Sequence, residues 1–279
     1  MPDIDINGAR LHYEIDGSGT ETILFCHGLL FSSRMFDEQV DALKDRYRCV
    51  RFDFRGQGES EVTDSGYDMD SLAADAVSLI EKLELGPVHL VGFSMGGFVG
   101  QRVALKRPEL LRSLTLINTS AERESGRKRP RYLLLNVIAR LFGLKVVVKR
   151  IMPILFSRRF IDSPELAEHR NRWTDYLIAN HRTGVTRAVR GVIDREAVID
   201  RIEQIRAPTL IITSDKDAAT PRIKSQRMHS AIRGSRLTTI ENAGHMTPAE
   251  RPERVNEVLI SFLMDLARTD EQSVGDDGE

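Results

Sequence analysis

The chain has 279 residues, of which 41% are hydrophobic and 29% are charged, and its formal net charge at pH 7 is -1. This length suits one large α/β domain with an inserted subdomain and a sizeable core. The near-neutral charge argues against nucleic acid as the main partner, because phosphate backbones attract strongly basic domains.

The sequence carries no signal for export or for a membrane span. The first residues lack the basic start and apolar run of a signal peptide, and no apolar run is long enough to cross a bilayer. Cys26 and Cys49 lie in apolar, strand-like segments, which favours buried reduced thiols over a disulfide framework. We therefore expect a cytoplasmic protein without integral membrane association. The spacing of Cys and His residues indicates no metal site.

Predicted strands and helices alternate along most of the chain. Residues 3–16 alternate polar and apolar side chains around Asn7-Gly8, the strongest short signal for a β-hairpin. We predict strands at 22–26, 49–53, 88–91, 114–118, 208–213 and 236–240, and helices at 35–45, 70–85, 97–108, 221–232 and 254–266. This alternation predicts an α/β fold with a mostly parallel central sheet flanked by helices.

The alternation stops near residue 121 and resumes near residue 207. The residues between, 121–206, favour helices, so we predict a helical cap inserted into a core formed by residues 1–120 and 207–268. The first half of the insertion is basic, with a dense run at Arg127–Arg131. It could steer anionic substrates or touch an acidic membrane surface, but a solvated helix face is the interpretation that we favour. Residues 269–279 are acidic and are expected to be disordered.

The stretch Gly-Phe-Ser-Met-Gly at residues 92–96 matches G-x-S-x-G, between a predicted strand and a predicted helix. A serine on such a turn is raised above the sheet, and the glycines leave no Cβ where neighbouring backbone passes closely. We therefore predict that Ser94 is a nucleophile. Five residues are weak evidence by themselves, and a glycine-softened turn with a capping serine is the alternative.

A serine hydroxyl needs a base within hydrogen-bond reach, and the base needs a carboxylate that fixes its tautomer. Of the seven histidines, His245 stands out, because it follows a strand and lies at the same sheet edge as Ser94. Asp217 lies just past another strand end. Asp215 competes with it for the role of the acid, with a turn-stabilising role as its alternative. The order Ser94, Asp217, His245 is typical of G-x-S-x-G hydrolases.

The oxyanion of a tetrahedral intermediate needs two fixed hydrogen-bond donors. We predict the N–H of Met95, directly after the nucleophile, and the N–H of Leu29, in the turn after strand 22–26. His27 in the same turn is expected to shape it by a hydrogen bond rather than to transfer a proton. The predicted pocket walls are Leu30, Phe31, Trp173 and Met246, with ordinary core packing as the alternative for Trp173.

Five motifs in order carry a family resemblance: HGLL at 27–30, DFRGQGES at 53–60, GFSMGG at 92–97, DAATP at 217–221 and AGHMTPAERPE at 243–253. With them the chain resembles the serine-dependent α/β hydrolases that include 3-oxoadipate enol-lactonase-like enzymes and carboxylesterases, over residues 4–266. The resemblance implies Ser94 as nucleophile, Asp217 as acid, His245 as base, and Leu29 and Met95 as oxyanion donors. The resemblance favours Asp217 over Asp215 as the acid, because the family places its acid four residues before the proline of Thr-Pro.

Two positions depart from the family pattern. Gln57 stands where the DFRGQGES motif most often has histidine, and Ser214 stands where the acid loop usually has glycine. We expect both to affect the shape of the pocket more than the triad. The serine at position 94 argues against the related haloalkane dehalogenases and epoxide hydrolases, which use aspartate there.

These observations predict a hydrolase that needs no cofactor and cleaves a small-molecule carboxylic ester or lactone through an acyl-enzyme at Ser94. We expect a monomer or a homodimer. Two alternatives stay open. The same triad could cleave a thioester or a carbon–carbon bond next to a carbonyl, and a chain of this fold could be a small-molecule receptor with little turnover.

Overall fold

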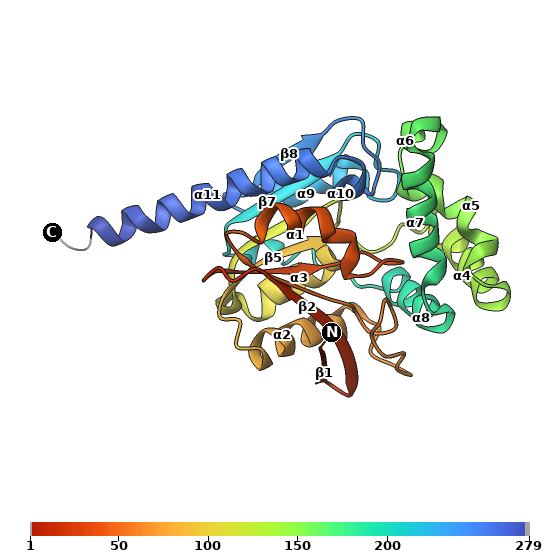
Figure 1. Ribbon diagram of the computed structural model, residues 1–279, viewed down its shortest axis with the longest axis horizontal. Coiled ribbons are helices and arrows are strands. Elements are labelled where there is room, and N and C mark those ends of the chain that lie inside the picture. Colours follow the sequence, from red (N-terminus) through yellow and green to blue (C-terminus); the bar gives the residue numbers. More distant parts are fainter. Residues whose placement is uncertain (1, 277–279) are drawn as a thin grey trace.

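A computed structural model describes residues 2–276, with side chains up to Thr269. At its centre lies one eight-stranded sheet with the order β1-β2-β4-β3-β5-β6-β7-β8 (Figure 1). The pairs β1–β2 and β2–β4 are antiparallel, and the other neighbours are parallel, which confirms the predicted mostly parallel sheet. The strands are β1 (Asp3–Ile6), β2 (Ala9–Asp16), β3 (Thr22–Cys26), β4 (Arg48–Phe52), β5 (Val88–Phe93), β6 (Leu111–Ile117), β7 (Thr209–Ser214) and β8 (Arg236–Ile240).

Helices cover both faces of the sheet. One hydrophobic core joins α1 and α11 to one face, and a second core joins α2, α3 and α9 to the other. The bounds of these helices are α1 (Asp37–Leu43), α2 (Met69–Lys82), α3 (Met95–Lys106), α9 (Arg222–Ala231) and α11 (Pro252–Asp276). Short helical turns precede α1 at Ser33–Phe36, follow α3 at Pro108–Leu110, precede β7 at Ile202–Gln204 and form α10 at Thr247–Glu250.

The first two strands form the predicted hairpin. Ile6 pairs with Ala9 across the turn, where Asn7 has a φ of 48° and Gly8 a φ of 75°. Two successive residues in the left-handed region are what a two-residue hairpin turn requires, and Asn-Gly is the pair that adopts them most readily.

The alternation of side chains in the central strands divides the core. In β3, Ile23 and Phe25 belong to the core under α1 and α11, while Leu24 and Cys26 belong to the core under α2 and α3. Side chains of a strand point alternately to the two faces, so both sets must be apolar when both faces are covered. Cys26 pairs with Gly92 of β5, which brings the loops after these two strands together at the same sheet edge.

Five helices lie between β6 and β7, beyond one end of the sheet, and we call them the inserted helices (Figure 1). They are α4 (Arg129–Phe142), α5 (Leu144–Leu155), α6 (Arg158–Asp162), α7 (Ala167–Ala179) and α8 (Arg182–Ile193), with a helical turn at Pro164–Leu166. The two ends of the insertion meet where the Ala121 carbonyl accepts hydrogen bonds from the amides of Val198 and Ile199. That residues 121–206 act as a separate cap stays a prediction.

The last helix is longer than the sequence indicated. Helix α11 continues to Asp276, beyond the predicted end at Leu266, and the predicted disordered tail therefore begins inside a helix. Residues 277–279 of that tail lie outside the described residues. Cys26 and Cys49 are both buried and free. Among the described residues, no helix is long and apolar enough to cross a membrane.

Candidate active site

Ser94 occupies a strained turn between β5 and α3. Its φ of 48° and ψ of -108° are rare for a residue with a side chain, so the surrounding structure must hold it there. A Cβ on Gly96 would lie 1.8 Å from the Cys26 carbonyl oxygen, and a Cβ on Gly92 would lie 2.5 Å from the Gly96 carbonyl oxygen. Only glycine fits at both positions, which explains why the serine lies between two of them.

The three side chains predicted as a triad form one chain of hydrogen bonds. His245 Nε2 lies 2.9 Å from Ser94 Oγ, and His245 Nδ1 lies 2.8 Å from Asp217 Oδ2. His245 and Asp217 are buried, and Ser94 is half-buried. The imidazole can therefore take a proton from the serine while the carboxylate holds the other ring nitrogen.

Asp217, not Asp215, makes this contact. One oxygen of Asp217 accepts from the backbone amides of Ala219 and Thr220 at 2.8 Å each, and the other accepts from the Thr220 hydroxyl at 2.7 Å and faces His245. These bonds fix the carboxylate before any substrate binds. Asp215 is exposed and pairs with Lys216 at 2.9 Å.

Asn118, which the sequence did not indicate as a site residue, holds the His245 loop from the end of β6. It follows β6 with a φ of 41°, and its side-chain amide lies 2.7 Å from the His245 carbonyl oxygen and 2.7 Å from the Thr247 hydroxyl. Ser214, at the end of β7, donates to the Gly244 carbonyl at 2.7 Å. Ser214 thus positions the loop and does not line the pocket, which corrects the expectation from its departure from the family pattern.

The His245 loop also rests on the inserted helices. Glu250 accepts from the Gly244 amide at 3.0 Å and from the amide and hydroxyl of Ser157, the N-cap residue of α6. The Met246 amide donates to the Leu155 carbonyl at 2.7 Å. Burial raises the pKa of Glu250 above its ordinary value. The position of His245 therefore depends on side chains from both the core and the insertion.

The loop after β3 passes beside the serine. A Cβ on Gly28 would lie 3.6 Å from the Ser94 Cβ, and the neighbouring Leu29 lines the same cavity as Ser94. Met95 is the first residue of α3, where backbone amides lack acceptors within the helix. Gln57 accepts from the Leu30 amide at 2.9 Å and supports this loop, so it too is a positioning residue and not a pocket wall.

His27 is built into the same loop and is fully buried. Its Nδ1 lies 2.8 Å from the Gly28 carbonyl oxygen, and its Nε2 accepts from the Phe54 amide at 2.9 Å. A nitrogen that accepts an N–H carries no proton, so the ring is neutral with its proton on Nδ1. Burial lowers the pKa of His27, in agreement with that state.

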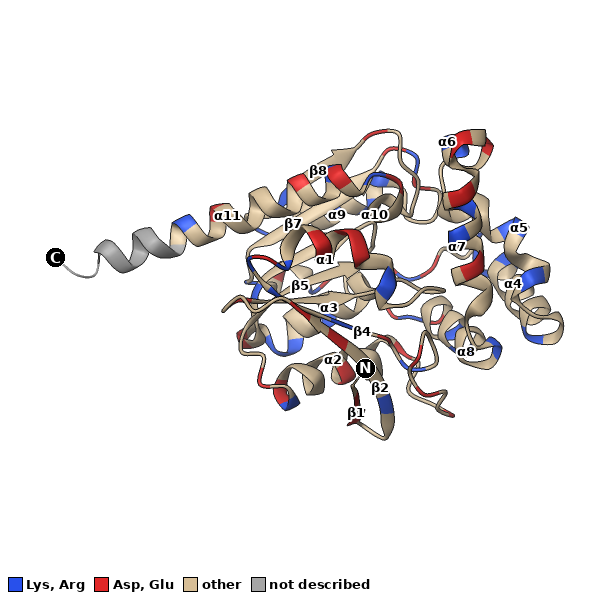
Figure 2. Ribbon diagram, in the orientation of Figure 1, with Lys and Arg blue, Asp and Glu red and all other residues tan. Residues whose placement is uncertain are grey.

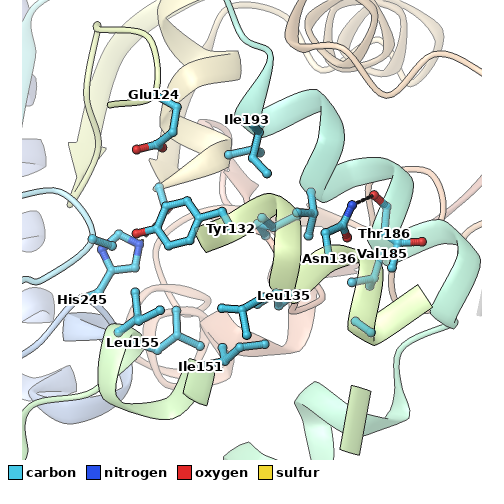
Figure 3. Close-up of a pocket in the computed structure, with 18 of the residues that line it drawn as sticks. Glu124, Tyr132, Leu135, Asn136, Ile151, Leu155, Val185, Thr186, Ile193 and His245 are labelled. Atoms are coloured by element: carbon cyan, nitrogen blue, oxygen red, sulfur yellow. Dashed lines mark hydrogen bonds between the residues drawn. The ribbon is translucent and has the colours of Figure 1, made fainter. Parts of the chain in front are cut away.

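A cavity of about 150 Å³ opens above Ser94 and His245. Its walls are mostly apolar and come from α4, α5 and α8 as well as from the core (Figure 3). Figure 3 shows Leu135, Ile151 and Leu155 on one side and Ile193 on another, with His245 at one end. Because these wall residues are far apart in the sequence, their inward faces could not be grouped before the helices were placed.

Polar groups in the cavity are few. Tyr132 of α4 points its hydroxyl toward His245 (Figure 3), and burial raises the pKa of Tyr132 to about 12, so that it stays protonated at neutral pH. Arg195 and Glu124 form an ion pair at 3.1 Å, and the Arg195 guanidinium lies 4.1 Å from the centre of the Phe98 ring. The charges of this pair cancel, so the cavity offers no net charge to a ligand.

The predicted pocket walls need correction. Leu30 lines the cavity, whereas Phe31, Trp173 and Met246 do not. Phe31 and Trp173 pack edge to face with ring centres 5.6 Å apart, and all three residues are buried in the core that α7, which carries Trp173, shares with the sheet. These large apolar side chains therefore stabilise the packing of the inserted helices on the core and do not shape the cavity.

Comparison with known proteins agrees with this architecture. A family model described as the alpha/beta hydrolase fold matches residues 21–252. The chain belongs to the α/β-hydrolase fold family. Its relatives include a hydrolase of Bacillus subtilis (strain 168), YugF, which is 26% identical over 267 residues, 92% of this chain and 96% of the relative.

Two solved structures show how closely this α/β hydrolase follows other members. A thermophilic esterase from Thermogutta terrifontis is 28% identical, with a TM-score of 0.87 over 95% of this chain and 99% of the other. An enol-lactonase from Burkholderia xenovorans LB400 is 24% identical, with a TM-score of 0.88 over 94% of this chain and 100% of the other, and this likeness shows the fold alone.

Proposed function

We propose that this α/β hydrolase cleaves carboxylic esters or lactones of apolar acids through an acyl-enzyme on Ser94. The observation that carries the proposal is the continuous chain of hydrogen bonds from Ser94 through His245 to Asp217. The likeness to an esterase at 28% identity supports the same reaction class.

In the proposed reaction, Ser94 Oγ attacks the carbonyl carbon while His245 Nε2 takes the hydroxyl proton. The amides of Leu29 and Met95 stabilise the oxyanion. His245 then delivers the proton to the leaving alcohol, and Asp217 stabilises the imidazolium in between. A water molecule attacks the acyl-enzyme with His245 as base, which releases the acid and restores Ser94.

The cavity supports an uncharged acyl group of limited size. An apolar cavity of about 150 Å³ has room for a molecule the size of benzene. The apolar walls favour a hydrocarbon, because burying a carboxylate there would leave its charge unpaired. We therefore expect the best acyl groups to be hexanoyl or phenylacetyl, and acids with a second carboxylate to be poor.

The test is steady-state hydrolysis of p-nitrophenyl esters from acetate to decanoate, beside small lactones, thioesters and β-diketones. Ser94→Ala should lower kcat by at least about 10⁴-fold. Ser65→Ala, which changes an exposed serine far along the chain from the turn, should leave kcat unchanged. A fluorophosphonate should label Ser94 in the unmodified protein and nothing in Ser94→Ala.

The outcomes separate the alternatives that the sequence left open. Turnover of thioesters or β-diketones without turnover of esters would replace the ester proposal but keep the triad. Labelling without any turnover would place the substrate outside this panel. If the protein neither turns over a substrate nor reacts with the fluorophosphonate, the proposal is wrong and the small-molecule receptor becomes the better interpretation.

A further inference from the structure

The outer side of helices α4 and α5 exposes large apolar side chains to solvent. Seven such side chains are exposed among the described residues, and all but Ile15 and Ile223 lie between residues 134 and 146. We call this group the outer apolar patch, and its exposed fractions run from 50% to 67%: Leu134, Val137, Leu141, Phe142 and Val146.

The patch has the regular geometry of a binding face. Leu134, Val137 and Leu141 follow one another at the spacing that places residues on one side of a helix. Phe142 ends α4, and Val146 lies in the first turn of α5. These side chains belong to neither hydrophobic core, whereas the opposite side of the same helices lines the cavity through Leu135, Ala139, Leu144 and Ile151.

The surroundings of the patch are strongly basic. Residues 125–161 hold ten of the 40 Lys and Arg residues of the chain and none of its 41 Asp and Glu residues. Figure 2 shows blue and no red on α4 and α5. On the helical wheel, Arg131 and Arg140 border the apolar stripe of α4 on its two sides, and Lys145, Lys149 and Arg150 share the outer side of α5 with Val146.

Most of these cations are not neutralised by the chain. Arg129 pairs with Asp194, Arg158 pairs with Asp162, and Lys128 donates to backbone carbonyls. The other seven are exposed and form no ion pair with the described residues: Arg127, Arg131, Arg140, Lys145, Lys149, Arg150 and Arg159. The whole chain has a net charge of only -1, so this positive charge is a local feature.

We propose that this face of α4 and α5 docks the protein on an anionic lipid surface. A bilayer of that kind supplies both an apolar layer for the patch and phosphates for the cations. A second copy of the chain fits less well, because a symmetric contact would bring two basic faces together. Helices α4 and α5 also lie at the opposite end of the molecule from α11 (Figure 1), where a flat surface can approach them.

Docking would be independent of the proposed reaction. It uses the outer side of the two helices, and Ser94→Ala should therefore bind lipid as well as the unmodified protein does. Docking would also affect activity, because the cavity lies directly behind the docked helices. It would bring the cavity close to the lipid, in which apolar esters are concentrated.

The test is flotation of the full chain with vesicles of phosphatidylcholine alone and with vesicles that also contain phosphatidylglycerol. We expect binding only to the second kind, and weaker binding as salt is raised. Each cation near an anionic surface increases partitioning about fivefold. Lys145→Glu with Lys149→Glu should therefore lower it at least about 25-fold, and Phe142→Ser should lower it several-fold.

The controls change matched residues elsewhere. Arg206 and Arg233 are exposed and unpaired among the described residues, so Arg206→Glu with Arg233→Glu is the charge control, and Ile223→Ser is the apolar control. The charge and apolar variants, in the patch and in the controls, should keep the thermal unfolding midpoint and the hydrolysis of a soluble ester. Equal binding to both kinds of vesicle, no binding to either, or equal losses in the control variants would overturn the proposal. Patch-dependent dimerisation without vesicle binding would do so too and would identify a second copy as the occupant.

Discussion

Replacing Asp217 by asparagine should abolish most of the activity through a change of tautomer. The backbone amides of Ala219 and Thr220 both donate to Asp217 Oδ1. In Asp217→Asn the amide oxygen must stay at that position, because an NH₂ group there would face two N–H donors. The NH₂ group then faces His245 Nδ1, where Oδ2 now accepts at 2.8 Å. His245 Nδ1 must become the acceptor, and the proton moves to Nε2.

A protonated Nε2 cannot take the proton of Ser94. We expect kcat to fall by about 10³–10⁴-fold, which corresponds to about 4–5.5 kcal/mol in the activation free energy. The assay is kcat and KM for p-nitrophenyl hexanoate, with the thermal unfolding midpoint as the control for folding. Asp215→Asn is the matched variant, and it should retain activity within about twofold, because Asp215 is exposed and contacts Lys216 instead. If Asp217→Asn keeps more than a tenth of the activity, the tautomer argument is wrong.

Three further changes test other parts of the structure. Gly96→Ala places a Cβ 1.8 Å from the Cys26 carbonyl oxygen, and it should lower the free energy of unfolding by at least about 3 kcal/mol in urea titration; an effect below about 1 kcal/mol would contradict the close approach. His27 has a lowered pKa in the folded state, so its stabilising contribution is complete above about pH 6.5 and is lost as the pH falls through the folded pKa. The free energy of unfolding should therefore fall less steeply on acidification in His27→Gln than in the unmodified protein, and parallel curves would refute this. Leu135→Trp should fill part of the cavity and shift the preferred acyl chain from hexanoate toward acetate at unchanged thermal stability, whereas an unchanged chain-length profile would place the acyl group elsewhere.

Much of the architecture was predictable because it depends on patterns of residues that are close together in the sequence. The Asn7-Gly8 turn, the apolar strands and the strand–turn–helix around Ser94 all depend on residues that are neighbours in the chain. In a parallel sheet the carboxyl ends of the strands meet at one edge, so residues after β5, β7 and β8 could be expected to converge. In the sequence, only the family resemblance favoured Asp217 over Asp215 as the acid. The tertiary structure shows which of the two carboxylates contacts His245, and it is Asp217.

Tertiary structure alone decided what surrounds and supports these residues. Asn118 holds the His245 loop through a contact between residues more than a hundred positions apart in the sequence. Glu250 holds the same loop by joining Gly244 of the core to Ser157 of the insertion. Phe31 and Trp173 pack against each other and not around the cavity. The sequence by itself determined the candidate chemistry, because the predicted nucleophile, base and acid each lie in a recognisable turn or loop after a strand. It could not determine the cavity or the outer face of α4 and α5, because an amphipathic pattern shows that a helix has two sides but not what lies against each of them.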